Sequence, residues 1–170
     1  MRKQCSVSSA FFLAALLADS TPVPLQIAAA AAQNVKESTD IAVVVNPANP
    51  TDNLSLEELK KVLLGEQTKW KNKTKIAVAL RPPGARERTV LLGRVLHMSE
   101  QEFKQSWMAA VFRGEADAEP FVAPSNGSAS SYLDVYQGGI AFMPGTDVRR
   151  DLKVLRINGR LPGESEYPVK

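Results

Sequence analysis

The stretch IAVALRPPGARER, residues 76–88, decides the fold class. Its first five residues are apolar and include β-branched side chains, a composition that predicts a short buried strand. Pro82, Pro83 and Gly84 end this strand, and a helix is expected to begin near Ala85 and to run to about Met98. A buried strand that turns directly into a helix is the basic unit of α/β proteins.

The same alternation of strands and helices continues on both sides of this stretch. Strands are predicted at residues 41–45, 140–143 and 153–157, and helices at 55–64, 99–113 and 128–137. Ser55 with Glu58, and Ser99 with Glu102, have the spacing of capping boxes at the starts of two of these helices. We therefore expect one α/β domain, a three-layer sandwich around a mainly parallel sheet of about four or five strands.

The N-terminal 32 residues have the pattern of a signal peptide. Arg2 and Lys3 precede an apolar run at 10–18, which is too short to span a bilayer, and a run of alanines follows before Gln33. The alternative is a buried N-terminal helix, but two prolines at positions 22 and 24 disfavour it. We expect cleavage near Ala32–Gln33, a single domain over residues 33–170 without a membrane span, and a periplasmic location.

Composition excludes several classes of function. The 21 basic and 18 acidic residues leave a net charge of +3, with no clustered basic stripe, so a nucleic-acid partner is not expected. His97 is the only histidine and Cys5 the only cysteine. No pair of imidazoles is therefore present for a zinc site, and no nucleophile–base pair can be named. We expect neither an enzyme nor a bound metal or cofactor.

Ligands of open α/β sheets bind beyond the carboxyl ends of the strands, which directs attention to residues 46–53, 81–88 and 125–131. In 81–88, free N–H groups at the turn into the helix favour an anion, and Arg81 can add a bidentate clamp. The alternative is an ordinary turn with solvated arginines. Residues 126–128, Asn-Gly-Ser, form a second small polar loop that can donate N–H and hydroxyl groups, or that serves only as a cap and linker.

The order of these segments resembles the substrate-binding proteins of phosphate ABC transporters, of the periplasmic-binding-protein type. The matching features span about residues 41–168. They are the helix from Leu54 to Gly65 with Trp70 after it, the strand 76–81 with Gly84, the helix with Phe103, Trp107, Phe112 and Gly114, the strand Gly139–Phe142, and the tail with Tyr167-Pro168.

The resemblance implies an exported solute-binding-like protein for phosphate or another oxyanion, with an ABC permease as a candidate partner. The ligand-binding residues that we predict, in part from this resemblance, are Arg81, Gly84, Ala85, Arg86, Asn126, Gly127 and Ser128. The family's anion loop has Ser-Gly-Thr where this chain has Ala85-Arg86-Glu87, so two hydroxyl ligands are missing and binding should be weak.

Members of this family have two lobes and are roughly twice as long as this chain. The resemblance therefore implies a single lobe with an uncovered ligand edge, which leaves room for self-association. The alternative function is that of an envelope scaffold or interaction protein that uses the same lobe without binding a ligand.

Overall fold

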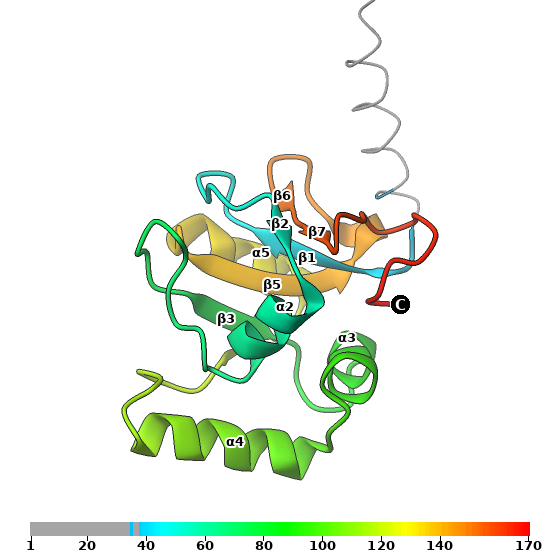
Figure 1. The fold of residues 1–170 in the computed structure, drawn as a ribbon. Coiled ribbons are helices and arrows are strands. Elements are labelled where there is room, and N and C mark those ends of the chain that lie inside the picture. Colours follow the sequence, from blue (N-terminus) through cyan, green and yellow to red (C-terminus); the bar gives the residue numbers. More distant parts are fainter. Residues whose placement is uncertain (1–34, 36–37) are drawn as a thin grey trace, which may run out of the picture.

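The computed structural model describes residue 35 and residues 38–170 (Figure 1). Its centre is a five-stranded sheet with the strand order β4-β3-β5-β1-β6. The strands are β1 (Ile41–Val45), β3 (Ala77–Leu80), β4 (Phe121–Val122), β5 (Gly139–Pro144) and β6 (Lys153–Val154). A separate parallel pair consists of β2 (Asn53–Leu54) and β7 (Arg156–Ile157).

The sheet is mainly parallel in strand direction. Strands β4, β3 and β5 are parallel neighbours. β1 is inserted antiparallel between β5 and β6, so that β6 points the same way as β5. The carboxyl ends of β3, β4 and β5 consequently lie at one edge of the sheet, and the carboxyl end of β1 lies at the opposite edge.

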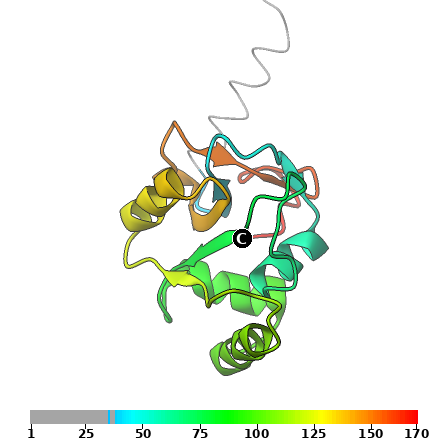
Figure 2. The same ribbon diagram turned by 90° about the vertical axis from the view of Figure 1, so that its left-hand side faces the viewer.

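Helices cover both faces of the sheet and produce three layers, as predicted (Figures 1 and 2). The helical elements are α2 (Leu56–Leu63), α3 (Arg86–Val90), the π-helical segment η1 (Leu91–Leu96), α4 (Glu100–Phe112), α5 (Asn126–Val135) and the short 3₁₀ turn η2 (Gly145–Asp147). α5 lies on one face of the sheet, and α2, α3, η1 and α4 contribute to a larger core on the opposite face.

The two cores follow from the alternation of side chains along the buried strands. In β1, Ile41, Val43 and Val45 belong to the larger core, whereas Ala42 and Val44 face the smaller core. The larger core takes bulky side chains from α2, η1 and α4, and the smaller core takes Ala129 and Leu133 from α5. Successive strand residues point to opposite faces, so a fully apolar strand serves both cores.

The two predicted capping boxes are confirmed. The Ser55 hydroxyl accepts from Glu58 N at 3.1 Å, and Glu58 Oε2 accepts from Ser55 N at 2.8 Å. Ser99 and Glu102 make the same pair of bonds at 3.3 and 2.7 Å. These contacts satisfy backbone N–H groups that the first helical turn leaves without partners, and they fix the starts of α2 and α4.

Four predicted element boundaries are wrong. The segment predicted as one strand over 153–157 is divided between β6 and β7, which belong to different sheets. The region 115–126, predicted as loop, contains the edge strand β4. The helix predicted at 128–137 begins at Asn126, because Ser125 serves as its cap. The helix predicted to reach Met98 ends at Leu96, because His97 adopts a left-handed conformation with φ 56°.

The predicted signal peptide, residues 1–32, lies outside the described residues. Within the described part of the chain, no helix combines the length and the apolar character needed to cross a membrane.

Tyr167 anchors the C-terminal tail against β1 and gives the fold a pH dependence. Its hydroxyl is buried and donates to Ile41 O at 2.8 Å. Burial, with a further contribution from nearby Asp40, raises the pKa of Tyr167 above its ordinary value of 10.0. The folded protein thus holds this proton at a pH at which the unfolded chain loses it, so the stability from this group is complete below pH 10 and declines above it.

We expect the free energy of unfolding to fall above about pH 10 by up to roughly 1.4 kcal/mol per pH unit from this group. Tyr167→Phe removes the titrating hydroxyl and should make that fall shallower. Urea unfolding of both proteins at several pH values between 8 and about 11 measures the two slopes. Equal slopes in the two proteins would contradict the assignment to Tyr167.

Candidate functional site

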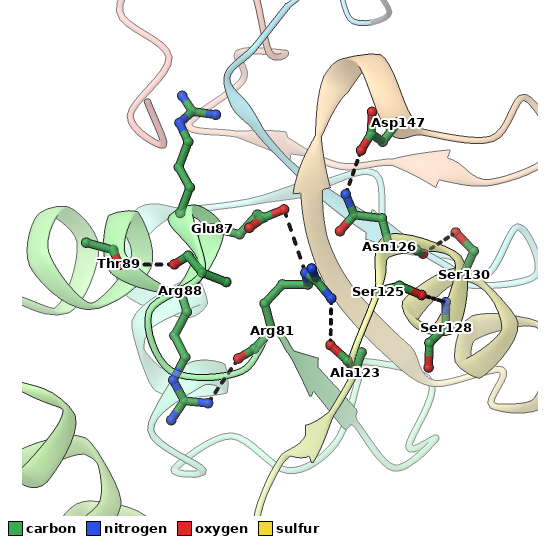
Figure 3. Close-up of polar contacts among 12 residues, drawn as sticks. Arg81, Glu87, Arg88, Thr89, Ala123, Ser125, Asn126, Ser128, Ser130 and Asp147 are labelled. Carbon is green, nitrogen blue, oxygen red and sulfur yellow. Dashed lines mark hydrogen bonds and ion pairs between the residues drawn. The ribbon is translucent and has the colours of Figure 1, made fainter.

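The candidate site lies where β3 and β4 end and the chain turns into α3 and α5 (Figure 3). Arg81 is the first residue after β3, and its Nη1 donates to Ala123 O at 2.8 Å. Ala123 is the first residue after β4. Because β3 and β4 are parallel neighbours, their following turns lie side by side, and the Arg81 side chain connects them.

The turn after β3 is shaped by Gly84 and by the missing cap at Ala85. Gly84 has φ +87°, a conformation that glycine adopts without the steric cost of a Cβ. Ala85 occupies the N-cap position of α3, and it has no side chain that could accept from the first N–H groups of the helix. The start of α3 thus lacks the side-chain cap that α2, α4 and α5 have.

The loop that opens α5 is capped by the side chain of Ser125. The Ser125 hydroxyl accepts from Ser128 N at 3.0 Å, so this N–H group is already used. Asn126 Nδ2 donates to Asp147 Oδ2 at 2.6 Å, whereas its Oδ1 is buried without a partner among the described residues. Gly127 is exposed, and a Cβ added there would lie 3.7 Å from Ser125 Oγ, an ordinary contact.

The structure brings some of the predicted site residues together and separates one of them. Arg81, Gly84 and Ala85 lie on one turn, and the loop that opens α5 lies beyond Ala123 (Figure 3). Arg86 is directed away from this loop, because its Nη1 donates to Thr39 O at 2.7 Å in the N-terminal segment. One of its donors is therefore used away from the α5 loop, and the place of Arg86 in the site stays a prediction.

Two carboxylates accompany the cationic side chain at this edge. Glu87 Oε1 lies 3.8 Å from Arg81 Nε, and the two side chains are 9% and 17% exposed. Asp147, which the sequence prediction did not include, is exposed and held by Asn126. Asp147 follows the end of β5 closely, so the rule that directed attention to the carboxyl ends of β3 and β4 would have found it as well.

The third segment that the sequence indicated, residues 46–53, does not belong to this edge. It follows β1, which runs antiparallel to β5, and therefore begins at the opposite edge of the sheet. Asn46 there has a structural role: its Nδ2 donates to Leu133 O at 2.7 Å and its Oδ1 accepts from Ala48 N at 2.8 Å. The sequence did not reveal that this strand runs antiparallel to its neighbours, and the rule for parallel strands was therefore applied to it as well.

Several solved structures have the same fold as this chain. An ABC-type phosphate transport receptor from Vibrio cholerae is 23% identical, with a TM-score of 0.58 over 72% of this chain and 48% of that protein. A putative phosphate ABC transporter substrate-binding protein with bound phosphate, from Clostridium perfringens, is 18% identical, with a TM-score of 0.61 over 76% and 51%. PstS from Borrelia burgdorferi is also 18% identical, with a TM-score of 0.61 over 76% and 53%.

This chain spans about half the length of each of these proteins, which fits one lobe of the periplasmic-binding-protein fold. A family model described as "PBP superfamily domain" matches residues 38–151, well over half of the chain. The predicted resemblance to substrate-binding proteins is thereby confirmed at the level of fold and family. The chain therefore belongs to the family that this model describes, the PBP superfamily domain.

Proposed function

We propose that this protein is an exported solute-binding-like protein that takes phosphate or a similar oxyanion weakly at the Arg81 edge. The observation that carries this proposal is the position of Arg81, whose guanidinium lies between two helix-opening turns at the carboxyl edge of the parallel strands. Its Nε is buried and has no hydrogen-bond partner among the described residues, so an N–H donor remains unused there. A guanidinium with free donors is suited to a planar or tetrahedral oxyanion.

Binding is expected to be weak for reasons that lie in the same turn. Ala85 and Glu87 provide no hydroxyl donor, and a hydrogen bond to a charged group contributes about 1.5–3 kcal/mol. The loss of two such donors corresponds to about 3–6 kcal/mol, or a hundred- to roughly ten-thousand-fold in affinity.

The proposal also includes export of the chain and binding to a partner protein. Residues 1–32 would direct the chain to the periplasm, and residues 33–170 would form the binding domain. An ABC permease or another envelope protein is the partner that we propose. The related structures are a phosphate transport receptor and a putative substrate-binding protein, which favours binding over catalysis for this chain.

An exposed aromatic surface favours the alternative function, an envelope interaction protein. Phe121 stacks on Tyr132 with ring centroids 4.7 Å apart, and Tyr132 contacts Tyr136 at 4.4 Å. Phe121, Val135 and Tyr136 are exposed, and the two tyrosines line a pocket of about 510 Å³. Exposed apolar patches of this kind often mark interaction sites. In the alternative function, the domain binds a partner protein through this surface and needs no ligand.

Replacement of Arg81 tests the proposed site. Arg81→Ala removes the charged donor and should weaken oxyanion binding by roughly ten- to a hundred-fold, because a charge-assisted hydrogen bond contributes about 1.5–3 kcal/mol. Titration calorimetry with phosphate and sulfate, at low and at physiological salt, measures this loss. Arg94→Ala is the matched control. Arg94 is exposed on η1, and its replacement removes the same positive charge at a position outside the candidate site.

Two results would contradict this assignment. Micromolar or tighter phosphate binding by the wild-type protein would show that the lost hydroxyls do not weaken the site. Oxyanion binding that is unchanged by Arg81→Ala would show that another part of the molecule holds the ligand.

A further inference from the structure

The donors of Arg81 are only partly used by the protein. Nη1 is committed to Ala123 O at 2.8 Å. Nε is buried without a hydrogen-bond partner, and the acidic atom it approaches is Glu87 Oε1 at 3.8 Å, beyond hydrogen-bond distance. The guanidinium and the carboxylate therefore attract one another by charge without a hydrogen bond between these two atoms.

Glu87 is buried at the point where an anion would approach Arg81. Its side chain is only 9% exposed, and no hydrogen bond to its carboxylate is present among the described residues. A carboxylate that is mostly removed from water is stabilised by a nearby cation. In Figure 3 the carboxylate of Glu87 is directed toward the guanidinium of Arg81, which supplies that cation.

The neighbouring arginines, Arg86 and Arg88, make their hydrogen bonds to groups other than Glu87. Arg86 donates to Thr39 O, away from Arg81. Arg88 Nε donates to both carboxylate oxygens of Glu100, at 2.8 and 3.0 Å, and its Nη1 donates to Arg81 O at 3.2 Å. The Arg81–Glu87 pair thus carries no net charge, and among the two neighbouring arginines Arg88 is paired with Glu100 while Arg86 makes its hydrogen bond at Thr39.

We infer that Glu87 is an internal competitor that occupies the free side of the Arg81 guanidinium, so that an inorganic oxyanion binds there only by displacing this carboxylate. The inference rests on the proposed function, because it takes Arg81 as the group that binds the anion. It assigns Glu87 as the residue that determines affinity at this edge, and it gives a local reason for weak binding besides the missing hydroxyls. Neutralisation of Glu87 should release the guanidinium for phosphate or sulfate.

The test is a set of titrations with phosphate and with sulfate at low salt. Glu87→Gln keeps the size of the side chain and removes its charge, and it should lower the Kd at least tenfold, about 1.4 kcal/mol. Glu57→Gln is the matched control, since Glu57 is exposed on α2 and the change in net charge is the same. The double variant Arg81→Ala with Glu87→Gln should lose the gain.

Thermal melting shows that each variant is folded and provides a second measurement. Glu87→Gln leaves Arg81 without its acidic partner, so added phosphate should raise its melting temperature more than that of the wild-type protein. Glu87→Met, which also removes the charge and adds no hydroxyl donor, replaces Glu87→Gln if the glutamine variant does not fold.

The outcomes separate this inference from the proposed function. A tenfold or larger gain in the Glu87 variant that depends on Arg81 supports the inference, even if the wild-type protein binds no oxyanion and the proposed function fails. Wild-type binding that Arg81→Ala abolishes, together with no gain from Glu87→Gln, supports the function and overturns the inference. A gain of equal size in Glu57→Gln would also overturn it, since net charge would then explain the effect.

Discussion

Phe142→Ala is expected to destabilise the protein by about 3–5 kcal/mol, a large part of the stability of a typical domain. Phe142 lies on β5, the middle strand of the sheet, and its side chain is 1% exposed within the larger core. Truncation removes the buried apolar surface of the ring and leaves a cavity that the surrounding strands cannot close. Urea unfolding at pH 7 should show a midpoint at least about 1 M lower than that of the wild-type protein.

Phe112 offers the same substitution at an exposed position. It is the last residue of α4 and is 93% exposed. Phe112→Ala should therefore change the free energy of unfolding by less than about 0.5 kcal/mol. Similar losses in the two variants would contradict the described position of the core.

Gly138→Ala should have a comparable effect through a steric clash. A Cβ at Gly138 would lie 1.9 Å from Lys75 O and 3.0 Å from Lys75 C, and both are backbone atoms that cannot rotate away. Gly138 O also accepts from Trp70 Nε1 at 2.9 Å and from Ala77 N at 3.1 Å. Any shift that relieves the clash weakens these bonds, so we expect a loss of about 3 kcal/mol or more.

Gly93 is the matched control for this substitution. It is exposed on the helical segment η1, and a Cβ there would meet no atom within 4 Å. Alanine is a better helix former than glycine, so Gly93→Ala should leave stability unchanged or raise it by up to about 1 kcal/mol. Melting temperatures and urea midpoints of both variants decide the comparison, and a tolerated Gly138→Ala would contradict the described contact with Lys75.

Local signals in the sequence were sufficient to predict most elements of the fold. Ser55 and Ser99 mark helix starts because the capping box is a local contact between residues three apart. Strand direction is different, because it depends on which partner a strand finds. The apolar run at 41–45 has the same composition whether it is parallel or antiparallel, and β4 is too short and exposed for periodicity to reveal it.

The candidate site was predictable only in part, because the directions of its side chains also depend on distant residues and on the path of the turn. Arg81 and Gly84 stand at the end of a strand, and that position can be read directly from the sequence. The direction of Arg86 depends on Thr39, which lies far away in the chain and accepts its hydrogen bond. The position of Glu87 against Arg81 likewise required the path of the turn, whereas the sequence showed only that a negative charge lay nearby.

The antiparallel insertion of β1 also sets the order in which the protein can fold. Its hydrogen-bonding partners are β5 and β6, which lie about a hundred residues further along the chain. During synthesis the apolar segment Ile41–Val45 therefore cannot pair with β5 until the residues beyond 140 have been made. Such long-range pairing slows folding and keeps the nascent chain open for longer. For a protein that we propose is exported, this delay provides the interval in which an unfolded chain can still be threaded across a membrane.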